Sequence, residues 1–452
     1  MQATLLWSLW QDLLRPFTNA FTKRGWPRFV EWVLGLALNV EEHTITQSLV
    51  GLDRVEDWKY LETFAEIGHW NRPIVDDTLA RLLETAPGRL WYGYRVEAID
   101  DTKIHRTSKH VWGTCTFHEY SARSPNRAAT VRAHNWVVLG ALLHHPGQPP
   151  WFLPQTGRLY FRQSQLPTTP DVEEFATKCE LAVELLQNQA RAVSGPHLAV
   201  FDGAFATRSV IRPLIQPELG CPRVDFVTRL RHDARLHEQP PTERPAGRRG
   251  PKRKWGRRLP PPRRGGRWRV PWQEGKAFIY GRLRVVRWKE VVCLWSVSGH
   301  AVPVKAVTAE VEGYTHRFHL VTSAVNLTGL QVVEIFAGRF RQEDGFRDLK
   351  QRLGWEECRA WTKKPVERTA WIEMLTMALL RLLQFRLEAL GEVDWWLRPP
   401  WNKRKQRPSI LDVERLLRQL RGEIQQLLSA WLGSVGEKPV GGACGDGGRG
   451  DP

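Results

Sequence analysis

Three places in the sequence offer carboxylates that could hold metal ions for phosphodiester chemistry. The pair Asp100-Asp101 closes a short alternating run typical of a strand. Asp202 closes a second, apolar run, and Glu343 lies within a long helical pattern. Carboxylate oxygens are ligands that Mg²⁺ prefers, and two such ions can activate a water or a 3′-hydroxyl and stabilise the leaving oxygen. Together the three places predict a metal site for this chemistry.

Each acid also has a purely structural interpretation. An Asp after a strand often caps a turn, which applies to Asp100, Asp101 and Asp202. Glu343 and Arg339 have the i,i+4 spacing of an ordinary ion pair on a helix surface, worth about 0.2–0.5 kcal/mol. The catalytic interpretation therefore rests on the combination of the acids and not on any one of them.

Glu343 shares one helical face with an aromatic residue and two cations. On an ideal helix, at about 100° per residue, Phe336, Arg339, Glu343 and Lys350 fall within about 60° of one another. Asp344 is turned away from this stripe, so Glu343 is the better candidate ligand. Arg339 and Lys350 would contact phosphates beside the reacting bond, the alternative being that both are simply solvated.

The elements that must position these acids predict a mixed α/β fold. Short apolar or alternating runs indicate strands, at 95–100, 134–143, 151–153, 197–202 and 224–230. Amphipathic runs indicate helices, at 171–193, 204–215 and 327–353. Strands first in succession and then alternating with helices predict a mixed sheet covered by helices. Ligands gather at the carboxyl ends of strands in such sheets.

The 452-residue chain is too long for one ordinary domain, and we expect six parts. They are a helical N-terminal domain at 1–90, a first core segment at 91–230, a β-rich insertion at 231–327, a core helix at 328–360, a helical C-terminal region at 361–432 and a disordered tail at 433–452. The N-terminal helices fit either recognition of DNA in a groove or a dimer scaffold, and we favour DNA. The C-terminal region is a candidate for dimerisation.

The positive charge is concentrated in one segment of the insertion. The chain has a formal net charge of +18, and residues 244–269 contain twelve basic residues and no acid. Pro and Gly break this segment, here called the basic arm, so we expect it to be mobile until it meets a polyanion. Its candidate DNA-binding residues are Arg248, Arg249, Lys252, Arg253, Lys254, Arg257 and Arg258. Trp255 and Trp268 interrupt the arm and could stack on unpaired bases. The alternative is a solvated linker.

Other features of the sequence exclude a membrane protein and a disulfide-stabilised one. The most apolar stretches, 29–40 and 371–385, contain Glu or Arg and fall short of the roughly 18 uncharged residues of a span. Residues 1–14 lack a basic start and make a poor signal peptide. The six cysteines are far apart, without a Cys-x-x-Cys pair, and His105, His110 and His134 lack ligand spacing. We expect a protein of the reducing cytoplasm.

The helix signature and the two strand-end acids resemble bacterial insertion-sequence transposases, which have a DDE (Asp-Asp-Glu) site and a ribonuclease H-like fold. The chain is most similar to the group marked by Tyr-x2-Arg-x3-Glu-x6-Lys, with Phe336 in place of the Tyr. The triplet Asp100-Asp101-Thr102 and the β-rich insertion before the Glu belong to the same resemblance. In that family an Asp-x-Ser/Thr triplet begins with the first catalytic Asp, which favours Asp100 over Asp101.

The resemblance implies a catalytic and metal-binding triad of Asp100, Asp202 and Glu343 with two Mg²⁺ or Mn²⁺ ions. It implies a protein that binds the terminal inverted repeats of its own element and pairs two ends as a homodimer. The enzyme would cleave the DNA strands and join the 3′ ends to target DNA, in the bacterial cytoplasm beside the nucleoid. Many members stack a flipped base on an aromatic of the insertion, and Trp288 and Trp295 are further candidates for that role.

Two alternatives stay open. A structure-specific nuclease or resolvase of the same fold would cleave without strand transfer. An inactive descendant of a transposase would bind DNA as a repressor or an architectural protein. The presence of all three acids argues against the inactive alternative.

Overall fold

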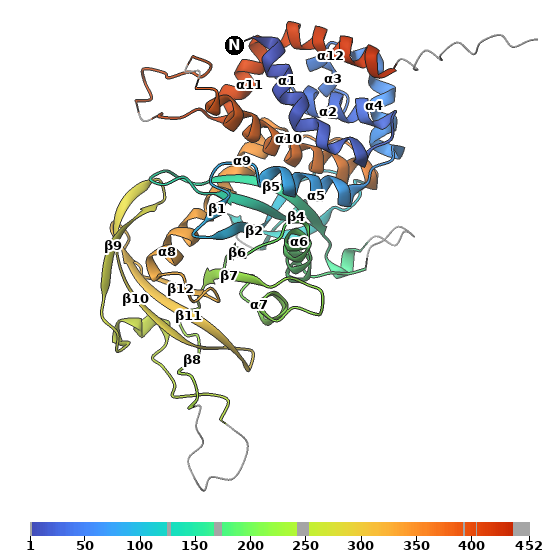
Figure 1. Cartoon of the computed structure of the whole chain (residues 1–452). Coiled ribbons are helices and arrows are strands. Elements are labelled where there is room, and N and C mark those ends of the chain that lie inside the picture. Colours follow the sequence, from blue (N-terminus) through green and yellow to red (C-terminus); the bar gives the residue numbers. More distant parts are fainter. Residues whose placement is uncertain are drawn as a thin grey trace, which may run out of the picture.

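The fold is a large twisted sheet beneath a body of helices, as the computed structural model in Figure 1 shows. The structure describes residues 2–123, 128–166, 174–241, 253–391, 394–403 and 405–436. The predicted fold class, a mixed α/β fold with helical N- and C-terminal regions, is confirmed.

The sheet has twelve strands in the order β3-β4-β2-β6-β7-β12-β11-β10-β8, with β1 paired to β2, β5 to β4 and β9 to β10. The strands are β1 (Leu90–Trp91), β2 (Tyr94–His105), β3 (Cys115–Arg123), β4 (Ala128–Leu143), β5 (Trp151–Tyr160), β6 (His197–Phe201), β7 (Val224–Arg229), β8 (Leu236–His237), β9 (Gln273–Ile279), β10 (Arg282–Val297), β11 (His300–Val311) and β12 (Phe318–Thr322). Strand β2 is antiparallel to β4 and parallel to β6, which is parallel to β7. Because β12 pairs with β7, the strands of the insertion continue the core sheet.

The helices of the two terminal regions pack into one body and do not stand apart as separate units. The helices are α1 (Ala3–Leu14), α2 (Gly25–Leu38), α3 (Ser48–Leu52), α4 (Trp58–Ile67), α5 (Arg72–Leu83), α6 (Lys178–Ala192), α7 (Arg208–Ile215), α8 (Gly329–Gly338), α9 (Arg341–Arg352), α10 (Lys363–Ala389), α11 (Ile410–Gln419) and α12 (Arg421–Gly436). Helix α10 contacts α1, α2 and α4, and Figure 1 shows these helices gathered on one side of the sheet. Helix α12 extends to Gly436, so residues 433–436 are helical and not part of a tail. The rest of the predicted tail, 437–452, lies outside the described residues.

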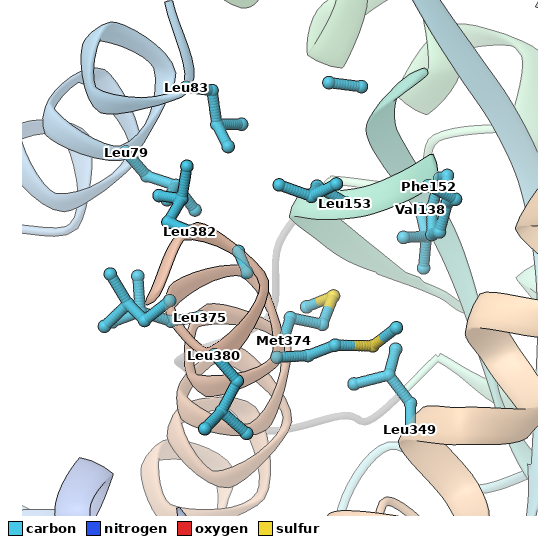
Figure 2. Close-up of a cluster of buried hydrophobic side chains, with 14 of the residues drawn as sticks. Leu79, Leu83, Val138, Phe152, Leu153, Leu349, Met374, Leu375, Leu380 and Leu382 are labelled. Atoms are coloured by element: carbon cyan, nitrogen blue, oxygen red, sulfur yellow. The ribbon is translucent and has the colours of Figure 1, made fainter. Parts of the chain in front are cut away.

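Helix α10 joins the helical body to the sheet through a cluster of buried side chains. Figure 2 shows Met374 and Leu375 of α10 near Leu79 of α5, Leu153 of β5 and Leu349 of α9. All five side chains are almost completely buried. Burying such side chains stabilises the fold by about 1.5–3 kcal/mol each. The cluster therefore fixes α9, the helix that carries Glu343, against the sheet.

The helix predicted at 327–353 is two helices that meet at Arg339 and Phe340. Around this junction the backbone forms i→i+3 hydrogen bonds, from the Arg339 amide to the Phe336 carbonyl (3.2 Å) and from the Gln342 amide to the Arg339 carbonyl (2.9 Å). Gln342 also donates through Nε2 to the Val138 carbonyl of β4 at 3.1 Å. The junction therefore places Arg339 and Glu343 at the point where α9 begins to pack on the sheet.

The basic arm is partly ordered. Residues 262–267 form a short 3₁₀ helix, and the Trp268 ring is buried, its indole N–H donating to the Pro260 carbonyl at 2.9 Å. Lys289 donates to the carbonyls of Gly266 and Trp268, both at 2.9 Å. The prediction of a mobile arm is therefore wrong for this part, because a buried indole anchors it. Residues 242–252 lie outside the described residues.

Candidate active site

The register of two parallel strands brings the first two predicted acids together. Ala98 of β2 pairs with Val200 of β6. Continuing that register by two residues sets Asp100 opposite Asp202, the residue after Phe201 at the end of β6. Neighbouring strands lie about 4.8 Å apart, so two carboxylates meet at one edge of the pairing.

Asp100 and Asp101 lie on opposite faces of the sheet, as successive strand residues must. The Asp100 carboxylate accepts a hydrogen bond from Nη1 of Arg339 at 2.7 Å. The Asp101 carboxylate accepts one from Nζ of Lys178 on α6 at 2.6 Å. Helix α6 covers the other face, where its first turn is closed by a capping box between Thr177 and Glu180. The geometry therefore favours Asp100, and not Asp101, as the partner of Asp202.

Arg339 lies between two of the predicted acids. Its Nη1 contacts Asp100 at 2.7 Å, and its Nη2 contacts Glu343 at 3.5 Å. The side chains of Arg339 and Asp100 are 15% and 19% exposed, whereas Glu343 is 49% exposed. The buried Nε of Arg339 has no hydrogen-bond partner within the described residues. The Arg339 guanidinium thus provides the positive charge that a bound metal ion would otherwise provide to Asp100 and Glu343, and its Nε–H remains without an acceptor.

The charge at Asp100 is not fully balanced. Burial raises the pKa of this carboxyl to about 6, and the nearby charge of Asp202 adds to the rise although Arg339 opposes it. Burial is the largest cause of the raised pKa, and the negative charge of Asp202 adds a smaller contribution. Strongly perturbed groups of this kind gather at functional sites.

The three carboxylates are suitable ligands for a hard divalent ion, but in this structure they do not lie close enough together to bind one. Across the described ranges, no three His, Cys, Asp or Glu side chains lie close enough together to hold a metal ion. Asp100, Asp202 and Glu343 would supply only oxygen donors, which suit Mg²⁺ or Mn²⁺. Arg339 keeps Glu343 apart from the two aspartates. Binding of an ion by all three acids would therefore require Arg339 to move.

The residues that share the helix signature with Glu343 have different environments. Phe336 is buried, so its ring belongs to the core of the fold. Lys350 donates through Nζ to the carbonyl of Lys103 on β2 at 2.6 Å and contacts Glu356 at 3.1 Å. The structure thus brings Lys350 to the strand that carries Asp100, while its ammonium is already engaged.

Two residues beside the site were not found from the sequence. Arg229 ends β7, next to the turn that carries Asp202, with its Cβ about 4.0 Å from where a Cβ on Gly203 would lie. Tyr280 stands at the tip of the β9–β10 hairpin, and its ring lies 5.6 Å from that of Phe340. Burial and Tyr314 raise the pKa of Tyr280, and the charges of Arg339, Arg229 and Glu343 also act on it. Tyr280 and Gly281, with φ of 47° and 80°, form the turn of this hairpin, and Gly281 is the residue whose type could have indicated a turn from the sequence.

The indoles proposed for base stacking are mostly in the core. Trp268, Trp288 and Trp295 are 3%, 5% and 6% exposed. A base could not reach their faces, so the stacking hypothesis is wrong for these three because they pack as apolar anchors. Trp255 is half-buried, and its ring lies 4.8 Å from that of His237.

The cations of the basic arm fall into two groups. Arg248, Arg249 and Lys252 lie outside the described residues, whereas Arg253, Lys254, Arg257 and Arg258 are exposed. Of the exposed ones, Lys254 donates to the Gly299 carbonyl at 3.1 Å and Arg257 pairs with Glu238 at 2.9 Å. The described cations are therefore held on the insertion, well separated in sequence from the acids.

Within the helices that the structure describes, none is both long enough and apolar enough to cross a membrane.

Comparison with known proteins identifies the family. No curated protein matches the chain. The sequence profile of the DDE superfamily endonucleases matches residues 16–292, more than half of the chain. The match includes Asp100 and Asp202 and ends before Glu343. Enzymes of this type cut DNA with divalent metal ions, generally Mg²⁺. The chain belongs to the DDE superfamily endonucleases.

Proposed function

We propose that this endonuclease is a DNA transposase that binds the terminal inverted repeats of its own insertion sequence. It cleaves the element ends in a cut-and-paste reaction and joins them to target DNA. The observation that carries the proposal is the proximity of Asp100 and Asp202 near the carboxyl ends of two parallel strands, beside an arginine that bridges Asp100 and Glu343. The resemblance of the helix signature to that transposase group supports strand transfer in addition to cleavage.

Each residue of the proposed site has a separate role. Asp100, Asp202 and Glu343 would hold two Mg²⁺ or Mn²⁺ ions. When bound, such ions activate the attacking oxygen and stabilise the leaving one. Arg339 would release the carboxylates and donate to a phosphate of the DNA. Its Nε is buried and has no hydrogen-bond partner within the described residues, so this movement would also give the Nε a partner. Arg229 and Lys350 supply further positive charge around the scissile phosphate.

The remaining parts of the chain serve DNA binding and assembly. The N-terminal helices recognise the element ends, and the basic arm grips phosphates nonspecifically. Two copies pair the ends as a homodimer, with the C-terminal helices as the candidate interface. The protein acts in the bacterial cytoplasm, where the nucleoid supplies its DNA.

An assay with purified protein tests the proposal. The protein is incubated with Mg²⁺, a duplex that carries the candidate inverted repeat and a supercoiled target plasmid. Cleavage together with a joined product is the expected result. Cleavage without joining would replace the proposal with a structure-specific nuclease, and retardation of the duplex without cleavage would replace it with an inactive DNA-binding protein. The variant Glu343→Ala should bind the duplex and not cleave it.

A further inference from the structure

A broad groove lies beside the candidate active site, between three segments that are distant in sequence. The loop between β4 and β5 forms one wall and the tip of the β9–β10 hairpin forms another. Residues 397–403 and 405–415, which lie after α10 and include the first part of α11, form the third. The cavity has a volume of about 1220 Å³. It is wide and open, unlike a closed pocket for a small molecule.

The described lining of this groove is basic. It contains six cations and neither Asp nor Glu: Arg282, Arg341, Lys403, Lys405, Arg407 and Arg415. The buried Asp412 balances part of this charge from below, contacting Lys405 at 2.6 Å and Arg415 at 3.2 Å.

Other cations of the groove have less or no carboxylate compensation. Arg341 pairs with Asp344 at 2.6 Å. Arg282, Lys403 and Arg407 make no ion pair with any residue that the structure describes. Since Arg282 and Lys403 are also exposed, the groove presents free positive charge to solvent.

Guanidinium groups are crowded at the floor of the groove. Arg407 and Arg381 each stack on the ring of Trp151 at 3.8 Å. Burial and the charge of Arg341 lower the pKa of Arg407 to about 10, so the side chain remains charged at neutral pH. Arg407 is held in place by hydrogen bonds to Oε1 of Gln148 (2.9 Å) and to the Pro149 carbonyl (2.8 Å). A polyanion would relieve the repulsion between these fixed like charges.

The groove continues toward the candidate active site. Pro149, Phe278, Gly281 and Arg341 line both the groove and a smaller hollow that also contains Tyr280 and Phe340. Phe340 lies next to Arg339 in the chain. On the outer side of the groove, the Trp401 side chain is 83% exposed. The groove therefore extends outward from the residues beside Glu343.

We propose that this groove binds the phosphate backbone of double-stranded DNA that runs out of the active site. The inference rests on the proposed function, because it assigns a second DNA contact to the same enzyme. The groove is distinct from the basic arm, residues 244–269, since none of the arm's described residues lines it. Cations from the hairpin tip, from the start of α9 and from residues 403 and 405–415 suit successive phosphates of a duplex, and such contacts give affinity without reading sequence.

The test compares DNA binding by two double variants. Arg282→Gln/Lys403→Gln removes the two exposed groove cations that make no ion pair. Arg208→Gln/Arg212→Gln removes two exposed cations of α7 and serves as the matched control for net charge. The probe is a 40-base-pair duplex of random sequence, with binding followed by fluorescence anisotropy at several salt concentrations. Thermal unfolding of all proteins checks the fold.

The groove variant should bind the duplex about tenfold more weakly, with a salt slope smaller by about two, since each lost phosphate contact removes about 0.9 from it. The control should match the wild-type slope. Equal loss in both variants would overturn the inference, because the effect would then be one of net charge. Loss for a single strand but not for the duplex would also overturn it. Failure of the wild type to bind any DNA would reject the proposed function itself, whereas unchanged binding by the groove variant alone would reject only the groove.

Discussion

Two acids of strand β2, the fully buried Glu97 and the partly buried Asp100, have pKa values that are shifted in opposite directions. Glu97 of β2 is fully buried and accepts from Nη2 of Arg89 at 2.6 Å, with Nδ1 of His197 at 3.2 Å. Burial alone would raise the pKa of Glu97, but Arg89 and His197 outweigh it and lower the pKa. Three residues further along, burial and Asp202 raise the pKa of Asp100 to about 6 despite Arg339.

We propose that the difference separates a structural ion cluster around Glu97 from the candidate active site around Asp100. A buried acid with two cationic partners stabilises the fold once it is in place, and removing any member leaves an uncompensated charge. Asp100 and Glu343 share a single arginine, and Asp202 lies near Asp100, so this cluster has more carboxylates than cations, as a binding site for a divalent ion would need. Glu97 and Asp100 lie only three residues apart on β2, so we attribute the difference between them to their hydrogen-bonding and charged partners.

The largest effect should come from replacing an acid of the candidate active site, where Asp100 and Asp202 lie. Asp202→Asn should lower Mg²⁺-dependent DNA cleavage on the order of 10³-fold, because a ligand of the catalytic ions is lost. The free energy of unfolding should change by less than about 1 kcal/mol, since Asp202 is half-buried at a strand end. Cleavage assays and urea unfolding of the same preparation measure both quantities. Cleavage at the wild-type rate would exclude Asp202 from the site.

Replacing Glu97 in the Glu97–Arg89–His197 cluster should mainly change stability. Glu97→Ala should lower the free energy of unfolding by about 3–5 kcal/mol. The buried His197 loses its carboxylate partner, and the buried Arg89 keeps only its ion pair with Glu84 among the described residues. Urea unfolding measures the change, with Asp100→Asn as the control from the other end of the comparison. Equal loss of stability in Glu97→Ala and Asp100→Asn would contradict the assignment of a structural role to Glu97 alone.

Arg339 should show a smaller effect that concerns metal binding. Arg339→Gln removes the cation between Asp100 and Glu343, so the DNA-free protein should bind Mn²⁺ about threefold to fivefold more tightly. This corresponds to an ion pair worth up to about 1 kcal/mol. Titration of Mn²⁺ followed by electron paramagnetic resonance measures the affinity. Weaker binding by the variant would mean that Arg339 supports the ion and does not compete with it.

The smallest effect should be a pH dependence of stability that comes from the His197–Glu97 pair. Burial lowers the pKa of His197, but Glu97 outweighs this and the pKa in the folded protein is raised above 6.5. The stabilisation is therefore complete below pH 6.5 and is lost as the pH rises through the folded value. Unfolding free energies of the wild type and His197→Gln, measured across this range, should converge with rising pH. Parallel curves would contradict the assigned charge state.

Features that depend on nearby residues could be predicted from the sequence. The strand-end positions of Asp100 and Asp202 follow from local hydrophobic patterns, and the mixed fold follows from the order of strands and helices. The i,i+4 spacing brought Arg339 to Glu343, as the 3.5 Å contact shows. These features need only the geometry of single helices and strands.

Features that depend on distant parts of the chain could not be predicted. The Arg339–Asp100 contact joins residues 239 positions apart. The sequence predicts base stacking by Trp268, whereas the ring is buried, because sequence does not show which side of an irregular segment is buried. The break between α8 and α9 depends on packing against β4, and the basic groove is assembled from three separate segments. Tertiary packing decides each of these features.

The most direct test of the central claim compares two neighbouring residues of identical chemistry. Asp100 faces Asp202 and Arg339, whereas Asp101 faces Lys178 on the other side of the sheet. Rates of Mg²⁺-dependent DNA cleavage should be measured for Asp100→Asn and Asp101→Asn under the same conditions. We predict that Asp100→Asn abolishes cleavage and that Asp101→Asn retains most of it. Full activity in Asp100→Asn, or loss of activity in Asp101→Asn alone, would contradict the proposed active site.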